Sequence, residues 1–516
     1  MSLTVLSEPD IRKLLLQLTK QDILDLQQSL ADALHHYSTS TEEDDNNGCC
    51  ESYQSAGTSF RSKDGGVMMV TPASRHVYQF SFFAWFCREK RHKSLIPCSN
   101  DGLGVKITTH LNNSIQDSRP SETGSINSSL GSLTLSQQST SSTKSLPTTR
   151  SSIHSLSFSA STQHGSLTLF DNSGKPRALL NTSEVTAFRT ALASTMLFKK
   201  RHNVHDVVVF GAGRQAYWHI RLALLLRGED IHHLNIINRD FEHVHQLLEM
   251  LYNPHEAPRA FNPDPQHIPT YRDPSQSEAL SRPKIQILTP SHSEYTRHLH
   301  ATLRSSSCIF LCTPSVAPLF PAAILTNPEG RKKGRYIAAI GSLSPSMVEL
   351  HPDIIRQNVA PEHGHRHFHK HAQQGGAIIV DSVDKCLREA GELVQAGLGP
   401  EQVVEIGELV MLKRDAERRR KECMASKKME DEGLDLGGVE LGECESSKKK
   451  TRGAGGKEKD KHHESEDKAH KSLIEWLTKG NVIYKSVGLG LMDVVVGSEL
   501  VNLADARSIG TRIDNF

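Results

Sequence analysis

A short apolar run followed directly by spaced glycines is the chemically most informative stretch of the sequence. Val207 to Phe210 is too short for a helix and rich in β-branched residues, so it predicts a buried strand. Gly211 and Gly213 follow at once, and Ala216 stands where a third small residue is needed. Such a turn brings backbone N–H groups and a helix N-terminus against a pyrophosphate. The pattern predicts that a dinucleotide is bound by the stretch Gly211, Ala212, Gly213, Arg214 and Gln215.

The residues after the next apolar run indicate which dinucleotide is bound. Leu234 to Asn238 is typical of a second strand, and it leads into Arg239 and Asp240 at the distance where the ribose is recognised. An acid at this tip would bind a ribose 2′-hydroxyl, whereas a guanidinium suits a 2′-phosphate. Asn238 and Arg239 are therefore candidate cofactor residues that favour NADP, while Asp240 leaves NAD as the alternative.

One loop carries alternating histidines. If the loop were extended, these imidazoles would share a face and could hold zinc or nickel. Alternation alone does not complete a defined ligand set, so we predict a solvated loop and no metal site. The histidines are His363, His365, His367, His369 and His371.

Composition limits the class of protein. The 516 residues are enough for two or three domains, and a formal net charge of +1 favours neither nucleic acid nor a membrane surface as a partner. Nine cysteines without paired spacing are typical of a reducing compartment. No signal peptide or membrane-spanning run is present, so we expect a cytoplasmic globular protein.

Strands that alternate with helical stretches must position the glycine-rich turn. Such alternation predicts an α/β fold with a parallel, doubly wound sheet. Its later strands are expected at Ile285–Leu288, Cys308–Cys312, Tyr336–Ile340 and Ala377–Val380.

The part of the chain before the glycine-rich turn predicts a second, mixed domain. Helices are expected within residues 7–37, and a helix capped by Thr182 or Ser183 is expected to run to about Lys200. The strands are expected at Val67–Val70, Val77–Trp85, Gly104–Thr109, Ser166–Phe170 and Arg177–Leu180.

Two segments lack any core-forming pattern. Residues 113–163 are rich in Ser, Thr, Gln and Asn, and residues 414–470 are rich in Lys, Glu and Arg. Neither can bury enough apolar surface to offset the entropy of ordering, so we expect a disordered Ser/Thr-rich insertion and a charged low-complexity insertion.

Several segments together are similar to the ornithine cyclodeaminase/mu-crystallin family. The most specific are the Thr-Ala-x-Arg-Thr and Lys-Ser-Val-Gly elements, which occur in the family's order. The matching segments are Leu167–Gly174, Val185–Thr190, Val209–Gly213, Thr313–Ser315, Glu349-Leu350, Val380–Ser382, Glu389–Leu393 and Tyr484–Gly488.

The resemblance implies a homodimer whose subunits each have two domains. A Rossmann-type NAD(P)-binding domain would comprise residues 201–413 and 471–489. A substrate-binding and dimerisation domain of α+β type would be formed by both chain ends, from residues 1–112, 164–200 and 490–516.

The resemblance also implies a set of site residues. Lys106 and Arg189 match the family's substrate lysine and carboxylate-binding arginine, which would hold an amino or imino acid. Thr190 and the amides of residues 213–215 would face the cofactor phosphates. The remaining matches are Thr313 on the adenosine side of the cofactor and Ser486 and Val487 on the nicotinamide side.

Two departures from the family's pattern bear on the chemistry. Gly57 stands where members often have a further arginine, with Arg61 as a candidate substitute. Leu343 stands where cyclodeaminases have an aspartate, and a leucine cannot take or give a proton.

Three functions remain open at this stage. The first is an NAD(P)-dependent reductase of cyclic imino acids, which acts on C=N bonds and is favoured by Leu343. The second is an ornithine cyclodeaminase that forms proline and ammonia. The third is a non-catalytic NADP-dependent protein that binds a small ligand.

Arg239 generates the first testable prediction. NADPH should bind more tightly than NADH, and Arg239→Ala should remove most of that preference, because a charge-assisted contact contributes about 1.5–3 kcal/mol. Titration of the two reduced cofactors by fluorescence measures both affinities. Equal affinities in the unmodified protein would contradict the assignment.

Overall fold

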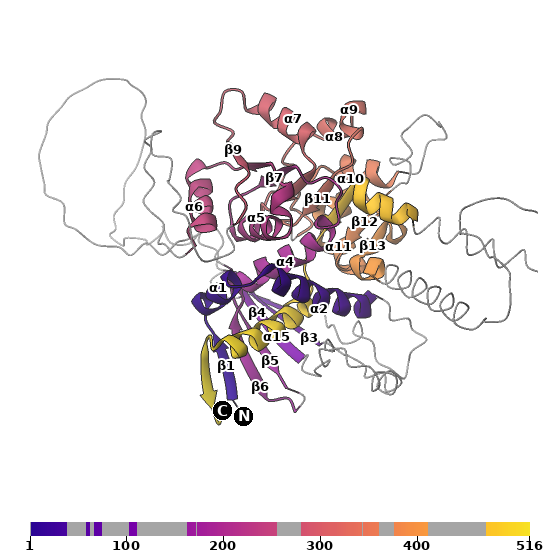
Figure 1. Ribbon diagram of the computed structural model, residues 1–516. Helices are drawn as coiled ribbons and strands as arrows, with labels where there is room; N and C mark the ends of the chain where they lie inside the picture. Colours follow the sequence, from indigo (N-terminus) through magenta and orange to yellow (C-terminus); the bar gives the residue numbers. More distant parts are fainter. Residues whose placement is uncertain are drawn as a thin grey trace, which may run out of the picture.

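The computed structural model shows two sheets joined by helices (Figure 1). It describes residues 2–38, 58–61, 67–74, 103–110, 163–171, 173–254, 280–342, 344–360, 376–410 and 471–516. The two insertions expected at 113–163 and 414–470 lie outside the described residues, apart from Gln163. So do the histidine-rich loop, Gly57, Leu343 and the strand expected at Val77–Trp85.

The first sheet has eight parallel strands in the order β13-β12-β14-β11-β10-β7-β8-β9. The expected doubly wound parallel sheet is thus confirmed, and the order reverses beside β7. Its strands are β7 (Asp206–Phe210), β8 (His233–Ile237), β9 (Lys284–Leu288), β10 (Cys308–Leu311), β11 (Tyr336–Ala339), β12 (Ile378–Val380), β13 (Val403–Glu405) and β14 (Val482–Lys485).

Alternate side chains of these strands enter two separate apolar clusters. Val207 and Val209 of β7 pack on one face of the sheet, whereas Val208 and Phe210 pack on the other. Burial on both faces explains why the strands are almost continuously apolar. The helices on the first face include α5 (Arg214–Arg227) and α6 (Phe241–Tyr252), and those on the second include α7 (Tyr295–Ser305), α10 (Pro352–Val359), α11 (Val383–Glu389) and α12 (Gly391–Ala396).

Short helical elements complete the connections of this domain. They are η4 (Gly228–Asp230), α8 (Ala323–Thr326), α9 (Pro328–Arg331) and η5 (Pro400–Gln402).

The second sheet is mixed and joins both ends of the chain. Its order is β15-β1-β6-β5-β4-β3-β2, with β1 parallel to β6 and the other pairs antiparallel. The strands are β1 (Ser2–Leu6), β2 (Thr58–Arg61), β3 (Val67–Ser74), β4 (Leu103–His110), β5 (Gln163–Phe170), β6 (Pro176–Asn181) and β15 (Thr511–Asp514). The sequence analysis did not predict β1, β2, β13, β14 or β15. Of these, β15 and β2 are the edge strands of the mixed sheet, whereas β1 lies between β15 and β6.

Helices cover one face of this mixed sheet. They are α1 (Glu8–Leu16), α2 (Lys20–Ser38), α15 (Gly490–Arg507) and α4 (Thr182–Phe198), which lies between the two sheets (Figure 1). The prediction that Thr182 or Ser183 caps α4 is wrong. The N-cap is Asn181, whose side chain accepts a hydrogen bond from the Ser183 N–H, so both expected caps lie inside the helix.

No helix among the described residues is long and apolar enough to cross a membrane.

Candidate functional site

The glycine-rich turn has the geometry that its sequence predicts. Gly211 has a φ of 102°, and a Cβ there would lie 2.8 Å from the carbonyl oxygen of Cys312. Nothing among the described residues lies within 4 Å of a Cβ built on Gly213, so its backbone is open to a ligand. Helix α5 begins directly afterwards at Arg214, and no described side chain caps it. Free N–H groups at such a terminus suit an anion.

Three further cofactor candidates are Ala212, Thr190 and Gln215. Ala212 is buried, and Thr190 in α4 donates a hydrogen bond from its hydroxyl to the Thr186 carbonyl at 2.8 Å. The Gln215 carbonyl accepts a bond from the His219 ring at 2.7 Å, within the helix.

The tip of β8 distinguishes the two residues that could recognise the ribose. The Asp240 carboxylate accepts the Glu242 N–H at 2.9 Å and pairs with His243 at 2.8 Å, so it caps α6. Asn238 donates to the Asp240 carbonyl at 2.8 Å, and Arg239 is exposed. This division of roles favours Arg239 as the ribose-side ligand.

A buried cluster of opposite charges joins Lys106 and Arg189. The Lys106 ammonium donates to Asp493 Oδ1 at 3.0 Å and to the Thr186 hydroxyl at 2.8 Å. The Arg189 Nε donates to the same Asp493 oxygen at 3.3 Å. All three charged side chains are more than 90% buried. The structure therefore brings together the two residues that the resemblance singled out and adds an acid that the sequence analysis missed.

Burial and charge shift two pKa values in this cluster. Burial lowers the pKa of Lys106, and the nearby Arg189 and Lys385 lower it further, although Asp493 opposes the shift. Burial alone would raise the pKa of Asp493, but Arg189 and Lys106 outweigh it, and the pKa is lowered. Asp493 is therefore a carboxylate at neutral pH, beside an ammonium that gives up its proton more readily than usual.

The Ser486–Gly488 loop closes over the Arg189 guanidinium. Gly488 has a φ of 82°, which favours glycine, and a Cβ there would overlap the guanidinium. Both the backbone conformation and the lack of space therefore require glycine at this position. Asp381 orders the loop by accepting bonds from the Ser486 hydroxyl at 2.9 Å and the Gly488 N–H at 2.6 Å. Lys385 donates to the Gly488 carbonyl at 2.8 Å, which places a third cation beside the cluster.

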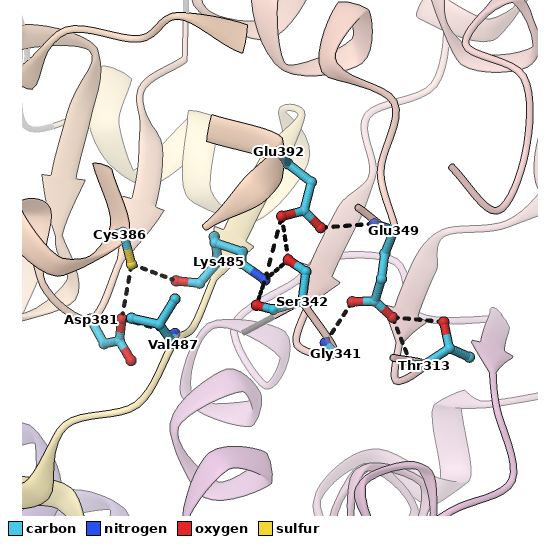
Figure 2. Close-up of polar contacts among 9 residues, drawn as sticks. All are labelled: Thr313, Gly341, Ser342, Glu349, Asp381, Cys386, Glu392, Lys485 and Val487. Atoms are coloured by element: carbon cyan, nitrogen blue, oxygen red, sulfur yellow. Dashed lines mark hydrogen bonds and ion pairs between the residues drawn. The ribbon is translucent and has the colours of Figure 1, made fainter. Parts of the chain in front are cut away.

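A second buried network ties the carboxyl ends of β11 and β14 together (Figure 2). The Lys485 ammonium donates to the Ser342 carbonyl at 2.8 Å and to its hydroxyl at 2.6 Å, and it lies 3.6 Å from the Glu392 carboxylate. Ser342 also hydrogen-bonds Glu392, whose other oxygen accepts the Glu349 N–H at 3.0 Å. Lys485 and Glu392 are fully buried, so each compensates the charge of the other.

Glu349 extends this network to the end of β10 (Figure 2). Its carboxylate accepts the Thr313 N–H at 2.6 Å, the Thr313 hydroxyl at 3.0 Å and the Gly341 N–H at 2.5 Å. Burial raises the pKa of Glu349 to about 7, against the lowering effects of Lys485 and these hydrogen bonds. Thr313 therefore lies at the carboxyl edge of the parallel sheet, and its hydroxyl is engaged by Glu349.

Sequence reasoning missed Asp493, Asp381, Glu392 and Lys485 as site residues. The last three lie in segments that carry the family resemblance, but their types alone do not show which charges pair. Asp493 did leave a signal, because it is the only charged residue in the apolar run from Val487 to Ser498.

Curated proteins are similar to this chain in sequence, whereas no family model matches it. An uncharacterized protein of Saccharomyces cerevisiae is 27% identical over 256 residues, which are 46% of this chain and only 61% of that protein. A Delta(1)-pyrroline-2-carboxylate reductase of Bacillus cereus is 24% identical over 346 residues, which are 66% of this chain and 71% of that protein.

Solved structures share the fold. Delta(1)-pyrroline-2-carboxylate reductase of Thermococcus litoralis, in complex with NADH and L-proline, has a TM-score of 0.53 and 13% identity over 99% of this chain and all of that one. A probable ornithine cyclodeaminase of Bordetella pertussis has a TM-score of 0.50 and 15% identity over 99% of both chains.

The sheet topology and the structural neighbours define a Rossmann-type α/β fold with a second domain. Within that class, the similarity in sequence to pyrroline-2-carboxylate reductase and in fold to a probable ornithine cyclodeaminase agrees with the resemblance to the ornithine cyclodeaminase/mu-crystallin family.

Glu349 generates a prediction about pH and stability. Its pKa is about 7 in the folded protein and its ordinary value is 4.5. The stability it contributes is therefore complete below pH 4.5 and is lost as the pH rises through about 7. Glu349→Gln should make the free energy of unfolding fall less steeply between pH 5.5 and 8, by up to about 1.4 kcal/mol per pH unit.

Chemical denaturation of both proteins at several pH values measures this slope. The slope is compared rather than the absolute stability, because the new amide cannot accept all the bonds that the carboxylate accepts. Identical slopes for the two proteins would contradict the assignment.

Proposed function

We propose that this protein is an NAD(P)-dependent reductase of cyclic imino acids, such as pyrroline- or piperideine-2-carboxylate. The observation that carries the proposal is the buried cluster of Lys106, Arg189 and Asp493 beside the Ser486–Gly488 loop. The similarity to pyrroline-2-carboxylate reductases in sequence and fold supports the same reaction class.

The residues present fit a nicotinamide dinucleotide. The open backbone at Gly213 and the uncapped start of α5 would hold the pyrophosphate, and Arg239 would hold a 2′-phosphate. Thr313 and the pair Ser486 and Val487 lie on loops at the carboxyl edge of the parallel sheet, where such ligands bind. When bound, the nicotinamide supplies a hydride.

The charge balance of the buried cluster suits a carboxylate substrate. Among the described residues, Lys106 and Arg189 share a single acid, Asp493, so one positive charge of this trio remains to be neutralised. A substrate carboxylate would complete the balance, and in this buried setting its contact with the cations is strong. Fixing the carboxylate also orients the adjacent C=N carbon for attack by hydride.

Lys106 is the group best placed to supply a proton. Reduction of a neutral imine adds a hydride to carbon and a proton to nitrogen. The lowered pKa of Lys106 makes its ammonium a better acid than usual, and Asp493 keeps it oriented. Lys106 would therefore bind the substrate and protonate the nitrogen.

Ornithine cyclodeaminase is the second candidate. The observation in its favour is Asp493, an ionised carboxylate that could accept protons from an amine. Both cations are bound to the same Asp493 oxygen, which makes it a weaker base, so we prefer the reductase.

Turnover assays test the function directly. The protein should oxidise NADPH with a cyclic ketimine carboxylate and release no ammonia from ornithine. Arg189→Ala should lower kcat/KM about ten- to a hundred-fold, through loss of about 1.5–3 kcal/mol, while NADPH affinity stays unchanged as the internal control. Rapid formation of proline and ammonia from ornithine would instead establish the cyclodeaminase.

We also propose a homodimer formed through the outer face of the mixed sheet. The strand register places five exposed apolar side chains on the face opposite the covering helices. A second copy of this chain would cover the whole patch, as expected for a large apolar surface. The five are Met68, Leu103, Ile107, Leu179 and Ile513.

The mass in solution tests the dimer. Light scattering should give about twice the 57.2 kDa of the chain. Leu179→Lys should shift the protein toward the monomer, because it places a charge in the middle of the patch. Val316→Lys is the matched control, since Val316 is 75% exposed on the other domain. A monomeric unmodified protein would rule out the interface.

A further inference from the structure

Helices α1 and α5 run side by side and touch at three successive levels. Glu8 pairs with Arg214 at 2.8 Å in the first turn of each helix. One turn on, the Arg12 guanidinium lies over the Tyr217 ring at 5.3 Å. A further turn on, Arg221 donates to the Leu16 carbonyl at 3.3 Å. The N-terminal helix of the mixed domain is thus aligned with the helix that carries the glycine-rich turn.

Glu184, in the first turn of α4, is the centre of this contact. One carboxylate oxygen accepts a bond from Arg12 at 3.0 Å and lies 3.7 Å from Arg214 Nε. The other accepts the Trp218 indole N–H at 2.6 Å. Only 2% of Glu184 is exposed, so one buried carboxylate joins three helices.

The same helix α4 links this centre to the substrate cations. Phe188, one turn after Glu184, packs edge-on against Trp218 with ring centroids 5.3 Å apart. The next residue is Arg189, which is bound to Asp493. Trp218 is thus held by two residues of α4, and it lies one turn after the start of α5. The contact therefore connects the proposed dinucleotide end of α5 with the proposed substrate end of α4.

Stability alone does not account for a charge at this position. Taking a carboxylate out of water costs several kcal/mol, and replacing a buried ion pair by apolar residues often leaves stability unchanged or higher. Directional contacts instead fix relative position, and a shift of about 1 Å between reacting groups can slow a reaction a hundred-fold.

We propose that Glu184 is a positioning residue that sets the distance between the bound cofactor and the substrate. It touches neither ligand. It acts by holding α5 against α4 and α1, so that the nicotinamide faces the Lys106–Arg189 cluster at hydride-transfer distance. This inference rests on the proposed reductase for its kinetic test.

Glu184→Gln tests the proposal, because it keeps the shape and removes the charge. NADPH affinity should change little, whereas kcat should fall about ten- to a hundred-fold. The primary isotope effect with deuterated NADPH should rise as hydride transfer becomes rate-limiting. The matched control is Asp230→Asn, which also removes a partner of an α5 arginine, Arg227, but at the far, half-exposed end of the helix. It should leave kcat unchanged.

A second measurement needs no substrate and separates this inference from the proposed function. The fluorescence of bound NADPH reports the surroundings of the nicotinamide, so Glu184→Gln should shift it toward that of free NADPH at equal saturation. A variant that only melts earlier, with unchanged kcat, isotope effect and emission, would overturn the proposal. So would a complete loss of NADPH binding. If the unmodified protein reduces no ketimine, the proposed function fails, and the emission alone decides the role of Glu184.

Discussion

The buried Asp493 carboxylate is the constraint around which the proposed substrate site is arranged. It lies on α15, near the end of the chain, and it binds Lys106 of β4 and Arg189 of α4 through a single oxygen. Three segments far apart in sequence therefore meet at one charge. Removing that charge would leave two buried cations together, at a cost of several kcal/mol. This explains why the mixed sheet and both flanking helices must be complete before the site exists.

Buried charged side chains also hold the loops at the carboxyl edge of the parallel sheet. The backbones of Thr313, Gly341 and Ser342 end adjacent strands, and each is held by a buried side chain from another segment. Glu349 and Lys485 provide these contacts, with Glu392 between them. Loops held in this way are preorganised, so binding of a ligand need not order them. The edge is thus rigid where the dinucleotide is proposed to lie.

The sequence predicted the parallel sheet and the glycine-rich turn from local pattern, and it predicted from family motifs that Lys106 and Arg189 belong to one site. It did not predict β1, β2, β13, β14 or β15, since strands this short have too few positions to show a distinctive period. It also missed the acids that pair with the cations. Which of several acids faces Lys106 or Lys485 is decided by tertiary packing, and no spacing in the sequence contains that information. Leu343, on which the choice of reaction first depended, lies outside the described residues.

The way the chain leaves and rejoins the mixed sheet explains how a long polar segment can interrupt it. His110 ends β4 and Gln163 begins β5, and the two residues are direct partners in the antiparallel ladder. The segment between them therefore starts and finishes at neighbouring points. The entropic cost of bringing the ends of a loop together grows only with the logarithm of the loop length. A longer segment between these paired residues therefore costs little more free energy. Lys106 is distant from the interruption, since it lies four residues inside β4 and its partner Leu167 lies equally deep in β5.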